Sequence, residues 1–182
     1  MRKINVVGTS ASGKTTLSRR LAKKLNLDYI ELDDLLWQNN WQETSDPEFF
    51  EKIQNKIRHA NADIHKNGYV IDGNYSRTTH ITWQEIDTVI WLDIPFHINL
   101  FQSIYRALTR AFTKKQLWMS SNNTESFSRM FGRESIVKWM IKTHAKNRKK
   151  YLAMMNNPQY AHIRFVRLES RKQAKTFIAN LS

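Results

Sequence analysis

Hydrophobic residues follow two spacings along the chain. Short runs rich in β-branched and aromatic residues, which favour strands, occur at 3–7, 29–32, 69–71, 88–92 and 162–168. Between them apolar residues recur every three or four positions, which predicts helices at 15–25, about 46–66, about 96–113, about 133–156 and 171–181. Strands that alternate with helices favour βαβ units. We therefore predict an α/β fold whose mainly parallel sheet is covered on both faces.

Helix boundaries and buried faces follow from the same pattern. Asp46 and Pro47 are typical of a helix start, and Asn67-Gly68 predicts its end. A core face is predicted on the helix from about 96, at Ile98, Phe101, Tyr105, Leu108 and Phe112. The inward face of the later helix is predicted at Val137, Met140, Ile141, His144, Arg148, Tyr151, Leu152 and Met155.

Two polar residues interrupt that inward face. An arginine on an apolar face is costly unless it meets an anion, so Arg148 is predicted to point toward one. His144 is predicted to be a hydrogen-bonded core histidine. Lys138, Lys142 and Lys146 lie on the opposite, solvated side of the same helix.

A phosphate-binding motif follows the first strand. Residues 8–15 fit G-x-x-x-x-G-K-[ST] and open the first helix. Such a loop aims backbone N–H groups at a polyphosphate, and the helix N-terminus adds partial positive charge. Lys14 is predicted to reach the β- and γ-phosphates of ATP, and the Thr15 hydroxyl to bind Mg²⁺. The predicted nucleotide-binding residues are Gly8, Thr9, Ser10, Ala11, Ser12, Gly13, Lys14, Thr15 and Thr16.

Composition narrows the class of protein. With 182 residues we expect one domain, 1–182, and the absence of cysteine excludes disulfides and thiolate chemistry. The first strand begins too early for a signal peptide, and no apolar run is long enough to span a membrane. We therefore expect a cytoplasmic protein without a membrane partner. Its oligomeric state is left open.

Charge is concentrated in the second half. Residues 101–182 hold 17 Lys and Arg against 3 Asp and Glu, whereas residues 1–100 hold 12 against 13. This asymmetry indicates a polyanionic partner, either the phosphates of bound substrates or nucleic acid.

Carboxylates close three of the predicted strands. Asp72 and Asp93 each end an apolar run, and one of them is expected near Mg²⁺. We favour Asp72 because Gly73 leaves room for a substrate, while Asp93-Ile94-Pro95 is typical of a helix N-cap. Asp33, or alternatively Asp34, is predicted to accept a proton from the attacking hydroxyl or to hold the acceptor.

The remaining candidates are arginines and tryptophans. Arg106 and Arg110 lie one helical turn apart, where their planar groups suit phosphate oxygens. Trp37 and Trp41 form either an aromatic wall for the acceptor or part of the core. The polar stretch 114–128 offers little to bury and is predicted to be a mobile lid, with Trp118 as its reporter.

These motifs together resemble the adenylate-kinase-like P-loop kinases, and within them the FlaR-related family of DNA topology modulation proteins. The matching positions run nearly end to end, at 8–15, 31–33 with Trp37 and Trp41, 71–75, 87–95, Arg106 and Arg110.

The resemblance implies a three-layer P-loop NTPase fold with a five-stranded parallel sheet in the order 2-3-1-4-5. It also implies a small helical lid at about 113–132 and an acceptor-side helical region at about 33–67. Arg106 and Arg110 would contact the transferring phosphoryl groups, and Arg148 the acceptor phosphate. Two departures concern the acceptor: Leu36 stands where these kinases carry an arginine, and Asn74-Tyr75-Ser76-Arg77 replaces their Phe-Pro-Arg.

Function is therefore predicted as transfer of the γ-phosphoryl group of Mg·ATP to a small acceptor, with Lys14, Asp33, Arg106, Arg110 and Arg148 as catalytic residues. The metal ligands are Thr15 and Asp72. The alternative is an ATP-binding protein that acts on nucleic acid through its basic C-terminal half.

Overall fold

The sheet has five parallel strands. The computed structural model describes residues 1–114, 116–126 and 135–181. Its strands are β1 (Lys3–Gly8), β2 (Asp28–Glu31), β3 (Tyr69–Asp72), β4 (Thr88–Leu92) and β5 (Arg164–Leu168). Their order is β2-β3-β1-β4-β5, and every neighbouring pair is parallel. This confirms the α/β fold and the strand order 2-3-1-4-5.

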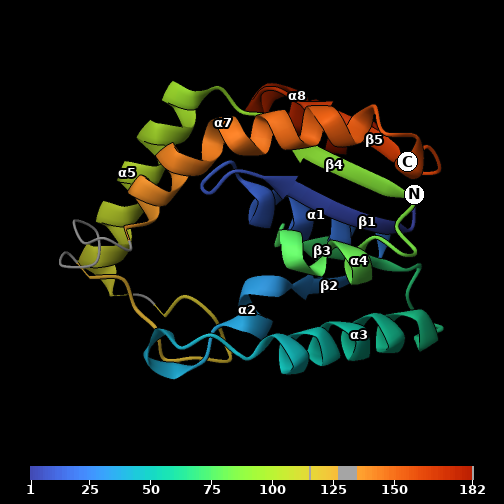
Figure 1. Cartoon of the computed structure of the whole chain (residues 1–182), viewed down its shortest axis with the longest axis horizontal. Helices are drawn as coiled ribbons and strands as arrows, with labels where there is room; N and C mark the ends of the chain where they lie inside the picture. The colour runs from blue at the N-terminus through green and yellow to red at the C-terminus, as the bar shows by residue number, and fades with distance from the viewer. Residues whose placement is uncertain (115, 127–134, 182) are drawn as a thin grey trace.

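Helices cover both faces of this sheet (Figure 1). On one face α1 (Lys14–Leu25) and α8 (Arg171–Ala179) pack against Ile4, Val6, Val70 and Ile90. On the other face the short α2 (Leu32–Leu36), α3 (Asp46–Ala62), α4 (Thr79–Thr82) and α7 (Ile136–Met155) contribute to a second core around Ile71 and Trp91. The sheet is thus buried on both sides, as its apolar strands require.

A polar side chain fastens the central strand to its neighbour. Asn5, in the middle of β1, is only 2% exposed. Its amide Nδ2 donates to the carbonyls of Ile71 and Gly73, each at 3.0 Å, and its Oδ1 accepts from Trp83 Nε1 at 2.8 Å. Because all its polar atoms are paired, Asn5 stabilises the end of β3, from which the site described below is built.

Helix α3 begins at Asp46, where its start was predicted, but its N-cap is Ser45 rather than Asp46. The predicted end is wrong, because the helix ends at Ala62, several residues before Asn67-Gly68. Gly68 instead lies directly before β3 at φ +133°, where a Cβ atom would lie 2.1 Å from the Arg2 carbonyl oxygen. The glycine therefore serves the close approach of two backbones and not the helix end.

Helix α5 (Phe96–Thr113) shows the opposite orientation from the predicted one. Phe101, Tyr105 and Phe112 are 71%, 66% and 74% exposed, so their assignment to the core is wrong. The buried face carries small or polar residues instead, at Asn99, Ser103, Ala107 and Ala111. Small side chains let α5 approach α7 closely, and a spacing rule that weighs only large apolar residues misses such a face.

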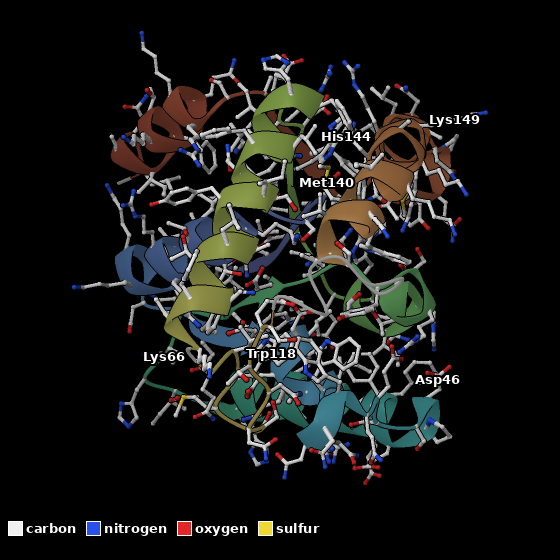
Figure 2. The ribbon with its side chains drawn as sticks, turned by 90° about the vertical axis from the view of Figure 1, so that its left-hand side faces the viewer. Asp46, Lys66, Trp118, Met140, His144 and Lys149 are labelled. Atoms are coloured by element: carbon white, nitrogen blue, oxygen red, sulfur yellow. The ribbon has the colours of Figure 1, made fainter. Side chains whose placement is uncertain are left out.

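The predicted inward face of α7 is correct only in part. Met140 and Tyr151 are buried, but Ile141 is 48% and Leu152 38% exposed. Figure 2 shows Met140 and His144 between α7 and α5, and Lys149 on the outer side. His144 Nε2 lies 3.1 Å from the Ile94 carbonyl oxygen, in agreement with a hydrogen-bonded histidine.

The segment 116–126 lies against the chain around α2. Ser121, Asn123 and Glu125 are at most 8% exposed, so the expectation that this stretch has little to bury is wrong. The backbone N–H of Trp41 donates to Asn123 Oδ1 at 2.9 Å, and that of Asn122 to Asn39 Oδ1 at 2.9 Å. The rest of the predicted lid, residue 115 and residues 127–132, lies outside the described residues.

Among the described residues, no helix has the length and apolar character needed to cross a membrane.

Candidate active site

The loop from Gly8 to Thr15 connects the end of β1 to α1. Gly8 has φ +150°, and a Cβ there would lie 2.8 Å from the Leu92 carbonyl oxygen, so only glycine fits. Gly13 has φ +100° and open space where a Cβ would be. It is the N-cap of α1 and provides no side-chain cap, and the first turn has no acidic residue. No side chain among the described residues caps the first N–H groups of α1, which are therefore available to bind an anion.

Lys14 is the first residue of α1 and is half-buried. Its Nζ donates to the Thr9 carbonyl at 3.2 Å. Burial lowers the pKa of Lys14, and the nearby charges of Asp72 and Asp33 act in the opposite direction. The ammonium group therefore lies among carboxylates over the loop, close to where a polyphosphate would bind.

Asp72 offers a free oxygen at this point. The residue is 3% exposed, and its Oδ1 is buried with no hydrogen-bond partner among the described residues. Its Oδ2 accepts from the Tyr29 hydroxyl at 2.9 Å. Burial raises the pKa of Asp72, whereas Lys14 and the hydroxyl of Thr15 lower it.

These oxygens fit a nucleotide-bound Mg²⁺. The described residues contain no group of three or more His, Cys, Asp or Glu that would form a closed metal site. Magnesium in phosphate-transfer proteins commonly takes only one or two protein oxygens and completes its shell with phosphates and water. Thr15 and Asp72 Oδ1 would supply those oxygens here, and the metal would neutralise phosphate charge.

Asp33 and Asp34 face different partners. Asp33 Oδ1 accepts from the Tyr75 hydroxyl at 2.6 Å, and its charge acts on Lys14. Burial is the main cause that raises the pKa of Tyr75 well above its usual range, and the negative charge of Asp33 is the next. Asp34 Oδ1 instead accepts from the backbone N–H of Ser120 at 3.0 Å. Of the two, Asp33 is the one beside the phosphate loop.

Arg106 and Arg110 reach this group from α5. Burial lowers the pKa of Arg106, while the charges of Asp33, Asp72, Glu31 and Glu125 raise it. Burial and the neighbouring Arg106 lower the pKa of Arg110 to about 10. The two guanidinium groups therefore lie near each other and near the carboxylates of this site, an arrangement that would suit the oxygens of a polyphosphate.

Arg148 does not belong to this cluster. Its side chain is 54% exposed, so it is not buried as an inward-pointing arginine would be. It does meet an anion, as predicted, because its Nε donates to the buried Asp93 Oδ2 at 3.3 Å. Asp93 also accepts from Arg167 Nε at 2.9 Å and Nη2 at 2.5 Å. It is not a helix N-cap, because that position in α5 is Pro95.

Sequence reasoning missed Tyr29, Glu31, Tyr75 and Glu125. A signal for the first pair was present, because Tyr29 and Glu31 are two apart in a strand and so share one side of the sheet. Tyr75 follows Asp72 in the chain, but its bond to Asp33 joins residues 42 positions apart. No local pattern indicates such a contact.

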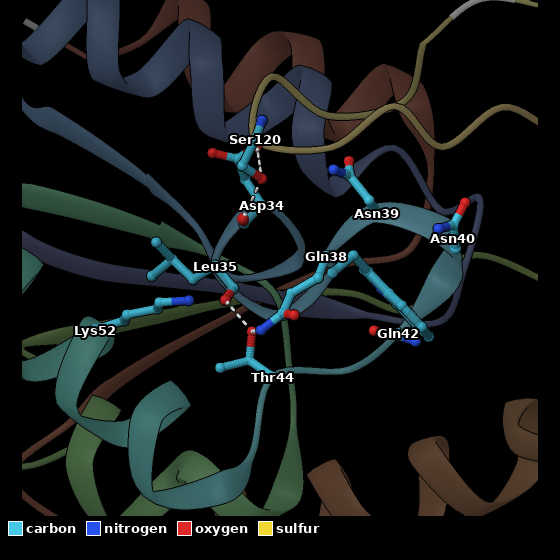
Figure 3. A pocket seen from close by; sticks show the side chains of 10 residues that line it. Asp34, Leu35, Gln38, Asn39, Asn40, Gln42, Thr44, Lys52 and Ser120 are labelled. Atoms are coloured by element: carbon cyan, nitrogen blue, oxygen red, sulfur yellow. Dashed lines mark hydrogen bonds between the residues drawn. The ribbon is translucent and has the colours of Figure 1, made fainter.

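Three tryptophans join the acceptor-side region to the segment 116–126. Trp37 and Trp118 stack with ring centroids 5.9 Å apart, and Trp41 contacts both edge-on at 5.8 and 5.7 Å. Trp37 also packs against the core. Beside them lies a hollow of about 250 Å³, in which Figure 3 shows the bond between Asp34 and Ser120 and the surrounding Gln38, Asn39, Asn40 and Gln42.

The strand order, the glycine loop at the end of β1 and the free helix N-terminus define a P-loop protein. The AAA domain family matches residues 4–138, and the chain belongs to it.

Among curated proteins, the bifunctional pantoate ligase/cytidylate kinase of Prochlorococcus marinus (strain MIT 9301) is 30% identical over 96 residues. The match covers 48% of this chain and 18% of that protein, so the chain spans less than a fifth of its relative.

Solved structures of kinases share the fold. A sugar kinase from Janibacter sp. HTCC2649 has a TM-score of 0.55 at 14% identity, over 98% of this chain and 91% of that one. A gluconokinase from Sinorhizobium meliloti 1021 has a TM-score of 0.50 at 12% identity, with the same two coverages. At these identities the likeness shows the fold alone.

Proposed function

We propose that this protein is an ATP-dependent kinase that transfers the γ-phosphoryl group of Mg·ATP to a small-molecule acceptor. One observation carries the proposal: beside a glycine loop whose helix N-terminus has no side-chain cap, Asp72 is 3% exposed and its Oδ1 has no hydrogen-bond partner among the described residues. Lys14, Asp33 and Arg106 contribute charge to the same cluster. Phosphoryl transfer depends mainly on positioning and charge neutralisation, and this cluster offers both.

Each side chain has a distinct role in this proposal. The loop amides and Lys14 would bind the β- and γ-phosphates, and Mg²⁺ held by Thr15 and Asp72 would neutralise developing charge. Arg106 and Arg110 would stabilise the transferring group. Asp33, hydrogen-bonded to Tyr75, would accept the proton of the attacking hydroxyl.

The arginine nearest the acceptor side is already engaged. Arg77, the candidate to replace the arginine missing at Leu36, is paired with Glu43 at 2.8 Å and Asp46 at 3.0 Å. Lys150 lines the same pocket as Tyr75 and donates to Ser76 Oγ at 2.8 Å. The engagement of Arg77 favours a hydroxylated acceptor over a nucleoside monophosphate. Residues 33–67 would bind it, and 113–132 would act as the lid. Within the P-loop kinases, the motifs at 71–75 and 87–95 support membership of the DNA topology modulation family.

The test is ATP consumption in the presence of nucleosides, nucleotides and small hydroxylated metabolites, tried one at a time. An acceptor will raise turnover well above the hydrolysis of ATP alone and will appear as a phosphorylated product. Lys14→Ala is the control and should lower this turnover at least about 100-fold while the protein stays folded. Turnover that no compound raises, or that survives Lys14→Ala, would refute the proposal.

Nucleic acid is the alternative partner, and the structure gives it less support. Arg106 and Arg110 face carboxylates, and Arg148 and Arg167 are paired with Asp93. If DNA were the partner, binding would persist at physiological salt. The logarithm of the association constant would then fall by about one unit per phosphate contact for each tenfold increase in salt concentration.

A further inference from the structure

A chain of side chains runs from the surface of α1 to the carboxylate of Asp72. Arg19 Nη2 donates to Glu31 Oε2 at 3.0 Å. The Tyr29 hydroxyl lies 2.9 Å from Glu31 Oε2 and 2.9 Å from Asp72 Oδ2. The Arg19 guanidinium also lies 5.3 Å from the centre of the Tyr29 ring. The Tyr29 side chain therefore contacts Glu31 and Arg19 on one side, and its hydroxyl contacts Asp72 on the other.

Donor counting decides where the Tyr29 proton goes. A phenol has one hydrogen, so at any moment it donates to only one of the two carboxylates. Glu31 already accepts a charge-assisted bond from Arg19, which compensates its charge. The Tyr29 hydrogen is thereby available to Asp72 Oδ2. This bond leaves Oδ1 as the unpaired, buried oxygen of the carboxylate.

We propose that Arg19, Glu31 and Tyr29 form a positioning chain that fixes Asp72 with Oδ1 directed to the Mg²⁺ of the bound nucleotide. The proposal rests on the proposed function, because it takes Asp72 as the metal carboxylate. Magnesium demands near-octahedral geometry, so a carboxylate free to rotate binds it less well. Partners of metal ligands typically contribute 10- to 100-fold in metal affinity.

The distinctive consequence concerns Arg19. Its side chain is 62% exposed, and it belongs to the outer side of α1. An exposed arginine that pairs with one carboxylate normally contributes little to folding. If the positioning chain operates, its removal nevertheless weakens metal binding, because Glu31 then competes with Asp72 for the Tyr29 hydrogen. A merely structural tyrosine gives no such effect.

The measurement is the affinity for a non-hydrolysable ATP analogue, by calorimetry, with and without Mg²⁺. The ratio of the two affinities reports how strongly the protein binds the metal of the nucleotide complex. It can be measured without catalytic turnover. We expect Tyr29→Phe to lower this ratio about 10- to 100-fold and to leave metal-free binding nearly unchanged. Arg19→Met, which acts through Glu31 and Tyr29, should lower it by about 10-fold, at the lower end of the same range. Arg20→Met, an exposed neighbour on α1, is the matched control and should leave it unchanged.

The outcomes separate the two levels of the account. If Asp72→Asn lowers the ratio but Tyr29→Phe and Arg19→Met do not, the positioning chain is refuted and the kinase proposal stands. If Mg²⁺ does not raise analogue affinity in the unmodified protein, both fail. Should Tyr29→Phe fold poorly, the comparison of Arg19→Met with Arg20→Met decides alone. Equal ratios for those two variants would overturn the proposal.

Discussion

Strands β3 and β4 flank β1 and both end beside a buried aspartate, yet the two carboxylates have opposite surroundings. Asp93 Oδ2 accepts three hydrogen bonds, two from Arg167 and one from Arg148. Asp72 lies beside the phosphate loop, and one of its oxygens has no hydrogen-bond partner among the described residues.

The difference shows what distinguishes a functional carboxylate from a structural one. Both residues end an apolar strand, and both are less than 10% exposed. A buried charge is costly unless its oxygens are paired. Asp93 is compensated within the fold, whereas Asp72 keeps one oxygen without a hydrogen-bond partner among the described residues, as expected of a carboxylate that would bind a cation. Hydrogen-bond satisfaction, rather than burial or position in the sequence, separates the two strand ends.

The largest expected effect is on catalysis. Asp72→Asn should lower Mg²⁺-dependent turnover by about 100-fold, because it removes charge at the metal while the loop amides still bind phosphate. Asp93→Asn should keep normal turnover per folded molecule. Steady-state rates at varied Mg²⁺ concentration check both. Normal activity in Asp72→Asn together with an inactive, folded Asp93→Asn would reverse our assignment.

Stability should show the reverse order. Asp93→Asn breaks the pairs with Arg148 and Arg167, which are partly exposed, so we expect a loss of about 2 kcal/mol in the free energy of unfolding. Asp72→Asn should cost little, since it removes a buried charge whose pKa is raised mainly by burial. Denaturant unfolding measures both. A larger loss in Asp72→Asn would argue against the comparison.

The two arginines at Asp93 should differ from each other. Arg167 makes two bonds to Asp93, pairs with Glu169 and lies 5.1 Å from the centre of the Trp91 ring. Its replacement by Met should cost about 1–2 kcal/mol, whereas Arg148→Met, at a half-exposed position, should cost less than about 0.5 kcal/mol. Unfolding midpoints measure this difference.

Arg148 also carries the prediction that it contacts the acceptor. If it does, Arg148→Met will raise the KM for the acceptor and Arg167→Met will not. An unchanged KM in Arg148→Met would leave this arginine as a surface partner of Asp93.

The smallest effect concerns the opposite end of β4. Burial alone would raise the pKa of Asp87, but hydrogen bonds from Thr88 and from the backbone N–H groups of Arg2 and Lys3 lower it. The resulting stabilisation is present above the pKa of the unfolded chain and is lost as pH falls through the folded pKa. Asp87→Asn should therefore cost less than about 1 kcal/mol at pH 7, and this difference should shrink in acid. A cost that does not change with pH would contradict this account.

Local sequence predicts the fold because each strand and its turn are encoded within a few residues. The glycine loop at 8–15 and the apolar runs of β1, β3 and β4 place the strands and the loop along the chain without reference to distant residues. The order of the strands in the sheet was predicted from the family resemblance instead. Helix α5 shows where this reasoning stops. It carries a stripe of large apolar residues and a stripe of small ones, and spacing alone does not say which one packs. In the folded protein the small residues Ala107 and Ala111 are the buried ones.

The candidate site divides in the same way. Lys14, Thr15 and Asp72 were predictable because motif and strand end determine their place. The bonds of Tyr29 to Asp72 and of Tyr75 to Asp33 span more than 40 residues. The first requires β2 beside β3, and the second brings α2 to the chain that follows β3. The pairing of Asp93 with Arg167 requires β5 beside β4, which a single strand pattern does not contain.

The most direct test of the central claim is a crystal structure with Mg²⁺ and a non-hydrolysable ATP analogue. We predict that the phosphates accept hydrogen bonds from the backbone N–H groups of residues 8–15. We also predict a magnesium ion that binds Thr15 Oγ1 and Asp72 Oδ1, either directly at about 2.0–2.1 Å or through one water molecule. Asp93 should keep its bonds to Arg167. A metal bound at Asp93, or a nucleotide bound away from this loop, would contradict the account.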